Sequence, residues 1–114
     1  HMAAIANLSV DQGATFSSDV TVADANGSPF NLSGYTAEAK LAKGYNSVNT
    51  RVSFTSTIAA DATTGVVSLQ LSKTQTEALD DTRYVYDLEI TQTSSGNVTR
   101  VIEGIITVRP QVSV

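Results

Sequence analysis

Apolar and polar residues alternate with a period of two along almost the whole chain, and this alternation limits the possible folds more than any other feature. Successive side chains of an extended strand point to opposite faces, so the pattern gives each strand one apolar and one polar face. Residues 83–93 are the clearest case, with one face formed by Tyr84, Tyr86, Leu88 and Ile90. The pattern predicts an all-β protein.

Seven segments carry the alternation, and turn-forming residues separate most of them. They lie at residues 5–10, 14–23, 35–42, 52–58, 67–71, 83–93 and 98–108. Because no long helices alternate with these segments, the strands are expected to form two packed antiparallel sheets, a β-sandwich. A small closed barrel has the same spacing and stays open as an alternative. Within the last segment, Gly104 predicts a bulge or a close approach by a neighbouring side chain.

One segment departs from the period of two. Ser72-Lys73-Thr74-Gln75 matches a capping box, in which a serine hydroxyl and a glutamine side chain each satisfy a free backbone N–H. We therefore predict one short helix over Lys73–Leu79, with Ala78 and Leu79 facing the core. Such a short helix is unstable alone, so it must pack across one end of the sandwich.

The 114 residues are enough for one domain, which we assign to residues 3–114. His1-Met2 has the form of a cloning remnant, and His1 is the only histidine. The chain contains no cysteine, which excludes disulfides and thiolate metal sites. Core packing is therefore expected to hold the domain together.

The charge pattern gives no sign of a nucleic-acid or membrane partner. Seven basic and eleven acidic residues give a net charge of −4, and the basic residues form no cluster that could neutralise phosphates. An apolar run of about 18 residues would be needed to cross a bilayer, and the sequence has none.

Catalytic residue combinations are also missing. Without a native histidine or a cysteine, Ser-His and Cys-His nucleophiles cannot be built, and no local motif selects a serine and lysine pair. Asp80 and Asp81 are adjacent, and Asp87 and Glu89 share a strand face that we interpret as solvated. Residues 24–27 begin like a calcium loop but lack its later ligands, so they predict a turn. We expect no enzyme activity, no cofactor and no metal.

The segment from Asp80 to Tyr86, DDTRYVY, resembles the corner of immunoglobulin-like domains, where a tyrosine opens the sixth strand. Tyr84 would be the corner tyrosine, its ring buried and its hydroxyl bonded to a backbone group near Asp80. Tyr86 would stand where antibody domains have a cysteine. The resemblance implies an Ig-like antiparallel β-sandwich of about seven strands with one short helix.

A second resemblance covers nearly the whole chain. The opening, DQGATFSSDVTVADANGSPFNLSGYTAEAKL, and the closing, RYVYDLEITQTSSGNVTRVIEGIITVRPQVSV, look like small Ig-like domains in virion proteins of tailed phages. The resemblance implies a non-catalytic structural or interaction protein of a bacteriophage particle, a component of its tail, neck, baseplate or capsid accessories. It would be made in the bacterial host cytoplasm and located in the virion, and its partners would be other virion proteins or further copies of itself.

Possible contact residues are few. Tyr45 stands in a polar loop and is a candidate anchor for a partner protein or glycan, so a host-surface or glycan-binding module of a phage adhesion apparatus is the alternative function. Association through strand edges is also expected, with the apolar strand Ile102–Val108 and the ends near Ile5 and Val114 as candidates. The remaining aromatic side chains are expected to pack in the core: Phe16, Phe30, Tyr35 and Phe54.

Overall fold

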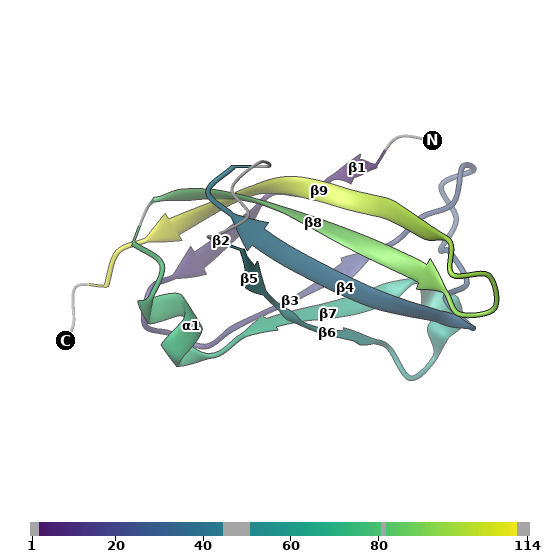
Figure 1. The fold of residues 1–114 in the computed structure, drawn as a ribbon, viewed down its shortest axis with the longest axis horizontal. Coiled ribbons are helices and arrows are strands. Elements are labelled where there is room, and N and C mark those ends of the chain that lie inside the picture. The colour runs from purple at the N-terminus through teal and green to yellow at the C-terminus, as the bar shows by residue number, and fades with distance from the viewer. Residues whose placement is uncertain (1–2, 45–50, 81, 112–114) are drawn as a thin grey trace.

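Two β-sheets packed against each other form the body of the protein (Figure 1). The structure, a computed structural model, describes residues 3–44, 51–80 and 82–111. One sheet has the order β1-β9-β8-β4-β5, with β2 also on β9, and the other has the order β3-β7-β6. The first sheet contains β1 (Ala4–Ile5), β2 (Leu8–Asp11), β4 (Tyr35–Ala42), β5 (Val52–Ser53), β8 (Arg83–Gln92) and β9 (Val98–Arg109); the second contains β3 (Phe16–Thr21), β6 (Thr55–Ile58) and β7 (Val66–Leu71).

Helical structure is confined to two short pieces in the part of the chain that is described. The α-helix α1 (Lys73–Glu77) follows β7, and the 3₁₀ turn η2 (Ala62–Thr64) precedes it. The chain is therefore mostly β-strand with one short α-helix, as predicted. The prediction was wrong in one detail, because α1 ends at Glu77, before Leu79, and the 3₁₀ turn η2 adds a second short helical piece. None of the helices in the described ranges is long and apolar enough to cross a membrane.

The first sheet is mixed, which corrects the prediction of wholly antiparallel sheets. Both β1 and β2 run parallel to β9, whereas β9-β8, β8-β4 and β4-β5 are antiparallel. A parallel neighbour needs a long connection, and here that connection is most of the sandwich itself. Parallel and antiparallel strands share the same side-chain alternation, so the pattern could not distinguish the two.

Two predicted strands are each divided in the structure. Residues 5–10 form β1 and β2, with a break at Ala6 and Asn7. Residues 52–58 form β5 and β6, which belong to different sheets because the chain crosses between them at Phe54. Phe54 is buried at this crossing, and its N–H donates to the Ala39 carbonyl at 3.0 Å. The described residues consequently contain nine strands instead of about seven.

Gly104 allows the break between β1 and β2. The tyrosine hydroxyl of Tyr86 donates to the Ala6 carbonyl oxygen at 2.5 Å, and the Asn7 side chain accepts the Ile105 N–H at 3.0 Å. A Cβ on Gly104 would collide with the Ala6 carbonyl. The glycine therefore serves the predicted close approach. The bulge lies at Val101 instead, since Leu88 pairs with Ile102 and Glu89 with Arg100.

The core lies between the sheets and follows the predicted faces. Every second residue of β7, β8 and most of β9 is buried, and these inward faces meet the inward faces of β3 and β4. Removing these apolar faces from water supplies the main stabilising free energy. The most deeply buried apolar side chains are Val10, Leu41, Val67, Leu69, Leu88 and Ile106.

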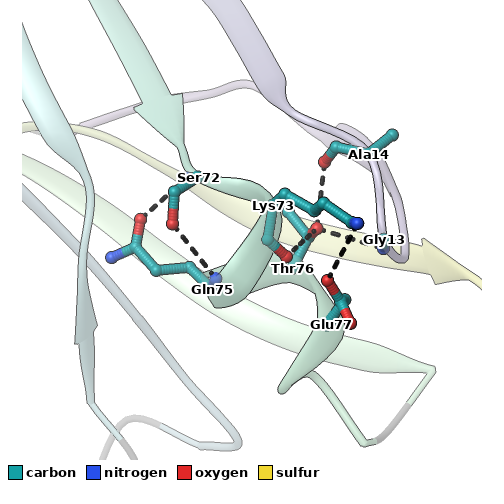
Figure 2. Close-up of polar contacts among 7 residues, drawn as sticks. All are labelled: Gly13, Ala14, Ser72, Lys73, Gln75, Thr76 and Glu77. Atoms are coloured by element: carbon teal, nitrogen blue, oxygen red, sulfur yellow. Dashed lines mark hydrogen bonds and ion pairs between the residues drawn. The ribbon is translucent and has the colours of Figure 1, made fainter.

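Helix α1 packs across one end of the sandwich, at the left in Figure 1, and Thr76 attaches it there. Ser72 and Gln75 form the predicted capping box. Thr76 is completely buried; its hydroxyl donates to the Ala14 carbonyl at 2.9 Å and accepts the Gly13 N–H at 3.1 Å (Figure 2). Leu79 faces the core as predicted, but Ala78 is exposed, and the sequence pattern missed Thr76.

Thr76→Val is expected to lower the free energy of unfolding by about 1–3 kcal/mol, because the isosteric change leaves the Gly13 N–H and the Ala14 carbonyl without this partner. Urea denaturation of the purified variant measures the effect. Thr74→Val is the matched control, since Thr74 lies on the same helix with its side chain exposed. Equal midpoints for the two variants would contradict the role of Thr76.

Gly104→Ala is expected to destabilise the fold by about 1–3 kcal/mol, as overpacking does, because the new methyl group must push the Ala6 carbonyl away from Tyr86. Thermal unfolding measures the loss, with Thr107→Ala, exposed on the same strand, as the control. A Gly104→Ala variant as stable as the wild type would show that the β1–β2 break is not held by this contact.

Candidate interaction surfaces

The predicted corner residue, Tyr84, opens β8 and closes the end of the sandwich near α1. Its side chain is only 3 % exposed. The hydroxyl accepts the backbone N–H of Asp80 at 3.1 Å and donates to the Asp80 carboxylate at 3.0 Å. This is the backbone contact that the sequence predicts for Tyr84, with an additional bond to the side chain.

Asp80 joins this corner to the loop after β4. Its carboxylate lies 3.3 Å from the Lys43 ammonium group. The hydrogen bond from Tyr84, followed by the hydrogen bond and charge of Lys43, lowers the pKa of Asp80 from its usual 3.8. The charged carboxylate is therefore stabilised in the folded state. The side chain of Asp80 is largely exposed, so the group supports the corner without forming a reactive site.

Charged side chains cover the outer face of β4, β8 and β9. Arg100 lies 3.2 Å from Asp87 and 4.0 Å from Glu103, and Lys40 lies 3.2 Å from Glu38. The face is hollowed by a shallow depression of about 210 Å³. Both signs of charge are present here, so the face does not gather the single sign of charge that binds phosphates, although Glu38 lies opposite Glu89 and Asp87 opposite Glu103 in the strand register.

Asp87 and Glu89 do share this outer face, as predicted. Both are half-buried against their neighbours, so the face is less fully solvated than the pattern suggested. Within residues 3–44, 51–80 and 82–111, no three acidic or histidine side chains gather in a way that could hold a metal ion. Residues 24–27 form the predicted turn, in which the Asp24 carboxylate accepts the backbone N–H groups of Asn26 and Ser28.

An apolar hollow of about 320 Å³ opens where β3 ends and β9 begins. Val22 and Val101 contribute to its lining, together with Phe30 and Tyr35, whose rings meet edge to face at 5.3 Å. The predicted packing of the aromatic residues thus divides in two. Phe16 and Phe54 are buried core residues, whereas Phe30 and Tyr35 are half-buried at the hollow. No sequence pattern indicates the hollow, because its lining comes from segments that are separate in the chain.

The remaining predicted contact residues are placed as follows. Tyr45, Asp81 and Val114 lie outside the described residues. Ile5 is 73 % exposed on β1, at the edge of the first sheet. The apolar strand Ile102–Val108 is not an edge, because β9 lies between β8 and the two N-terminal strands. This strand is apolar because it is buried. Its position inside the sheet leaves no backbone edge of residues 102–108 for a partner.

Comparison with known proteins gives no match: no family model and no curated protein matches the sequence.

Tyr84→Phe is expected to lower the free energy of unfolding by about 1–2 kcal/mol at neutral pH, because the Asp80 N–H loses its acceptor and the carboxylate loses its donor. Chemical denaturation at pH 7 measures this loss. Tyr35→Phe is the control, because no hydrogen bond of the Tyr35 hydroxyl is found within the described residues. Equal losses in both variants would contradict the corner contact.

The difference in stability between the wild type and Tyr84→Phe should depend on pH. A carboxylate with a lowered folded pKa adds stability above its unfolded pKa and loses it as the pH falls through the folded pKa. The difference between wild type and Tyr84→Phe should therefore be full at pH 7 and shrink once the pH falls below about 3.8. A stability difference that is independent of pH would show that the carboxylate of Asp80 takes no part.

Proposed function

We propose that this chain is an immunoglobulin-like sandwich that acts by non-catalytic association as a structural component of a tailed-phage particle. The observation that carries the proposal is the corner contact between Tyr84 and Asp80, found in the segment that resembles Ig-like domains. The fit of both ends of the sequence to small phage virion domains supplies the phage context. The virion component concerned would be a tail, neck, baseplate or capsid accessory protein.

The strand order supports the Ig-like part of the proposal. In Ig domains one sheet contains strands C, F and G, and the other contains B, E and D with E in the middle. Here β4, β8 and β9 take the first set of positions, and β3, β7 and β6 take the second. The short β5 beside β4 corresponds to the additional strand of variable-type domains. The N-terminal strands β1 and β2 depart from the Ig strand order, because they lie parallel on β9 instead of beside β3.

The physical properties of the sandwich support an association role. Four of the eight connections between the nine described strands have five residues or fewer, and the buried apolar residues form one core cluster. A rigid module orders few side chains when it docks, so little of its binding free energy is lost. The outer face of β4, β8 and β9 presents paired charges instead of a cleft suited to a substrate.

One observation favours the alternative, a host-surface or glycan-binding module. The apolar hollow between β3 and β9 has two half-buried rings, Phe30 and Tyr35, on its wall. Aromatic rings beside a hollow can anchor a small ligand. The two rings meet edge to face, so their mutual contact covers a face of only one of them. The resemblance of both ends of the sequence to virion domains is the ground for preferring the association role.

Mass spectrometry of purified virions of the phage that encodes this chain should find it in multiple copies, because a structural component stays with the particle through purification. The control is a non-virion protein from the same infected cells, which must be absent from the particles. Detection of the chain in lysate and never in virions would overturn the proposal. Binding to a glycan array, lost in Tyr35→Ala, would instead support the alternative.

A further inference from the structure

We propose that the free edge of β3 is a self-association surface, on which β3 of a second copy pairs antiparallel to join the two three-stranded sheets into one. This inference deepens the association role proposed above and rests on it, but it does not depend on a phage origin. The occupant is another molecule of this chain, held by backbone hydrogen bonds along an unguarded strand edge.

The backbone of β3 presents unpaired groups on the side away from β7. The Val22 N–H donates to the Gly65 carbonyl, in continuation of the β3–β7 ladder. Backbone direction alternates along a strand, so Val20 and Ser18 also face β7. The N–H and C=O groups of Ser17, Asp19 and Thr21 then point outward. None of the described hydrogen bonds outside regular strands uses them.

This edge is the least protected of those at the ends of the two sheets. The others are shorter: β1 and β5 have two residues each, and β2 and β6 have four each, whereas β3 has six. On β2, moreover, Asp11 forms an ion pair with Arg109 at 2.6 Å. Natural edges are protected by charged side chains, above all lysine, by proline or by bulges; β3 (FSSDVT) has no lysine, proline or bulge, and its one charge is Asp19. A regular strand edge with so little protection is a template for a further strand.

Charge selects the register of such a pair. Only residues whose backbones point outward can exchange hydrogen bonds, so Ser17, Asp19 and Thr21 must face one another across the two-fold axis. Centring the pair on Asp19 would set the two carboxylates directly opposite each other, which is destabilising. Centring it on Ser18 sets each Asp19 opposite Ser17 of the second copy. The hydroxyl can then donate to the carboxylate, and five residues of β3 from each copy still pair within the strand, residues 16–20.

The pair is also closed and self-complementary. A two-fold antiparallel edge uses the same patch on both copies and leaves no second β3 edge for a third molecule. The outward side chains of Ser17, Asp19 and Thr21 are all exposed, so they are accessible to a second copy, while Phe16 and Val20 remain in the core of their own copy. The structure therefore favours a discrete dimer over a filament at this edge.

Single-cysteine variants test the register directly, because the chain contains no cysteine of its own. Centred on Ser18, the two copies of this residue form a non-hydrogen-bonded pair with Cα atoms about 4.5 Å apart, within the roughly 4.4–6.8 Å that a disulfide spans. Mild oxidation of Ser18→Cys should give a covalent dimer quickly, because the two copies of residue 18 lie opposite each other only in this register. Ser9→Cys, an exposed serine on the β2 edge, gives the rate of random collision.

Sedimentation of the full chain tests the association without cross-linking. The wild type should shift from monomer to dimer with rising concentration, and Ser17→Pro should lose the dimer because it removes an outward N–H. Ser9→Pro is the matched control on β2. The Gln12 N–H donates to the Arg109 carbonyl, and backbone direction alternates along the strand, so Val10 also faces β9 and the N–H of Ser9 points away from the sheet. Circular dichroism must show both proline variants folded.

The outcomes separate the two proposals. Fast cross-linking of Ser18→Cys with loss of the dimer in Ser17→Pro supports pairing at β3. Cross-linking no faster than that of Ser9→Cys, or a wild type that stays monomeric at every concentration, overturns it. A monomer still found in purified virions would refute self-pairing alone, whereas a dimer absent from virions would refute the particle role alone.

Discussion

The chain contains no cysteine, so no disulfide joins the two sheets. Their packing depends on a line of aromatic rings through the core. The ring of Phe16 on β3 lies 6.2 Å from that of Phe54, at the crossing between the sheets, and Phe54 lies 6.0 Å from Tyr86 on β8. The Tyr86 hydroxyl then reaches the Ala6 carbonyl at the far edge of the first sheet. This line connects the two sheets, and Gly104 provides the space for its last contact.

The end of the sandwich near α1 is closed by polar contacts, each of which satisfies backbone groups that strands leave free. Thr76 bonds to the turn before β3, and Tyr84 bonds to the Asp80 backbone ahead of β8. Gln12 bridges the Leu79 carbonyl and the Gln111 N–H, so it ties the helix to both β2 and the segment after β9. Buried or half-buried polar groups cost free energy unless they are paired, and these contacts pair them. The end is thereby fixed without a disulfide.

The surface divides into regions with different capacities. The outer face of β4, β8 and β9 carries acidic and basic side chains that form ion pairs with one another, which leaves little net charge for a partner. The backbone edge of β3 is the reverse case, since its side chains are small and polar and its hydrogen-bonding groups are unused. An association protein without a deep cleft has to bind through such edges or flat faces. The uneven protection of the edges is therefore more informative about function than any single side chain.

The local pattern of the sequence determined which residues are buried, and it also determined several short-range contacts. Alternation identified the inward faces of β7 and β8, and the spacing of Ser72 and Gln75 identified the cap of α1. The contact of Tyr84 with Asp80 was expected from the resemblance of this segment to Ig-like corners, and the two residues are only four positions apart. In all these cases the interacting groups lie within one strand or one turn.

Only the tertiary structure decided which strands are neighbours. The parallel placement of β1 and β2 on β9, the crossing at Phe54 and the anchoring of Thr76 at Gly13 all join segments distant in the chain. A strand with one apolar face carries the same pattern whether it pairs parallel or antiparallel, and whether it lies inside a sheet or at its edge. The free edge of β3 and the interior position of β9 were therefore invisible in the sequence, because both follow from the packing of the whole chain.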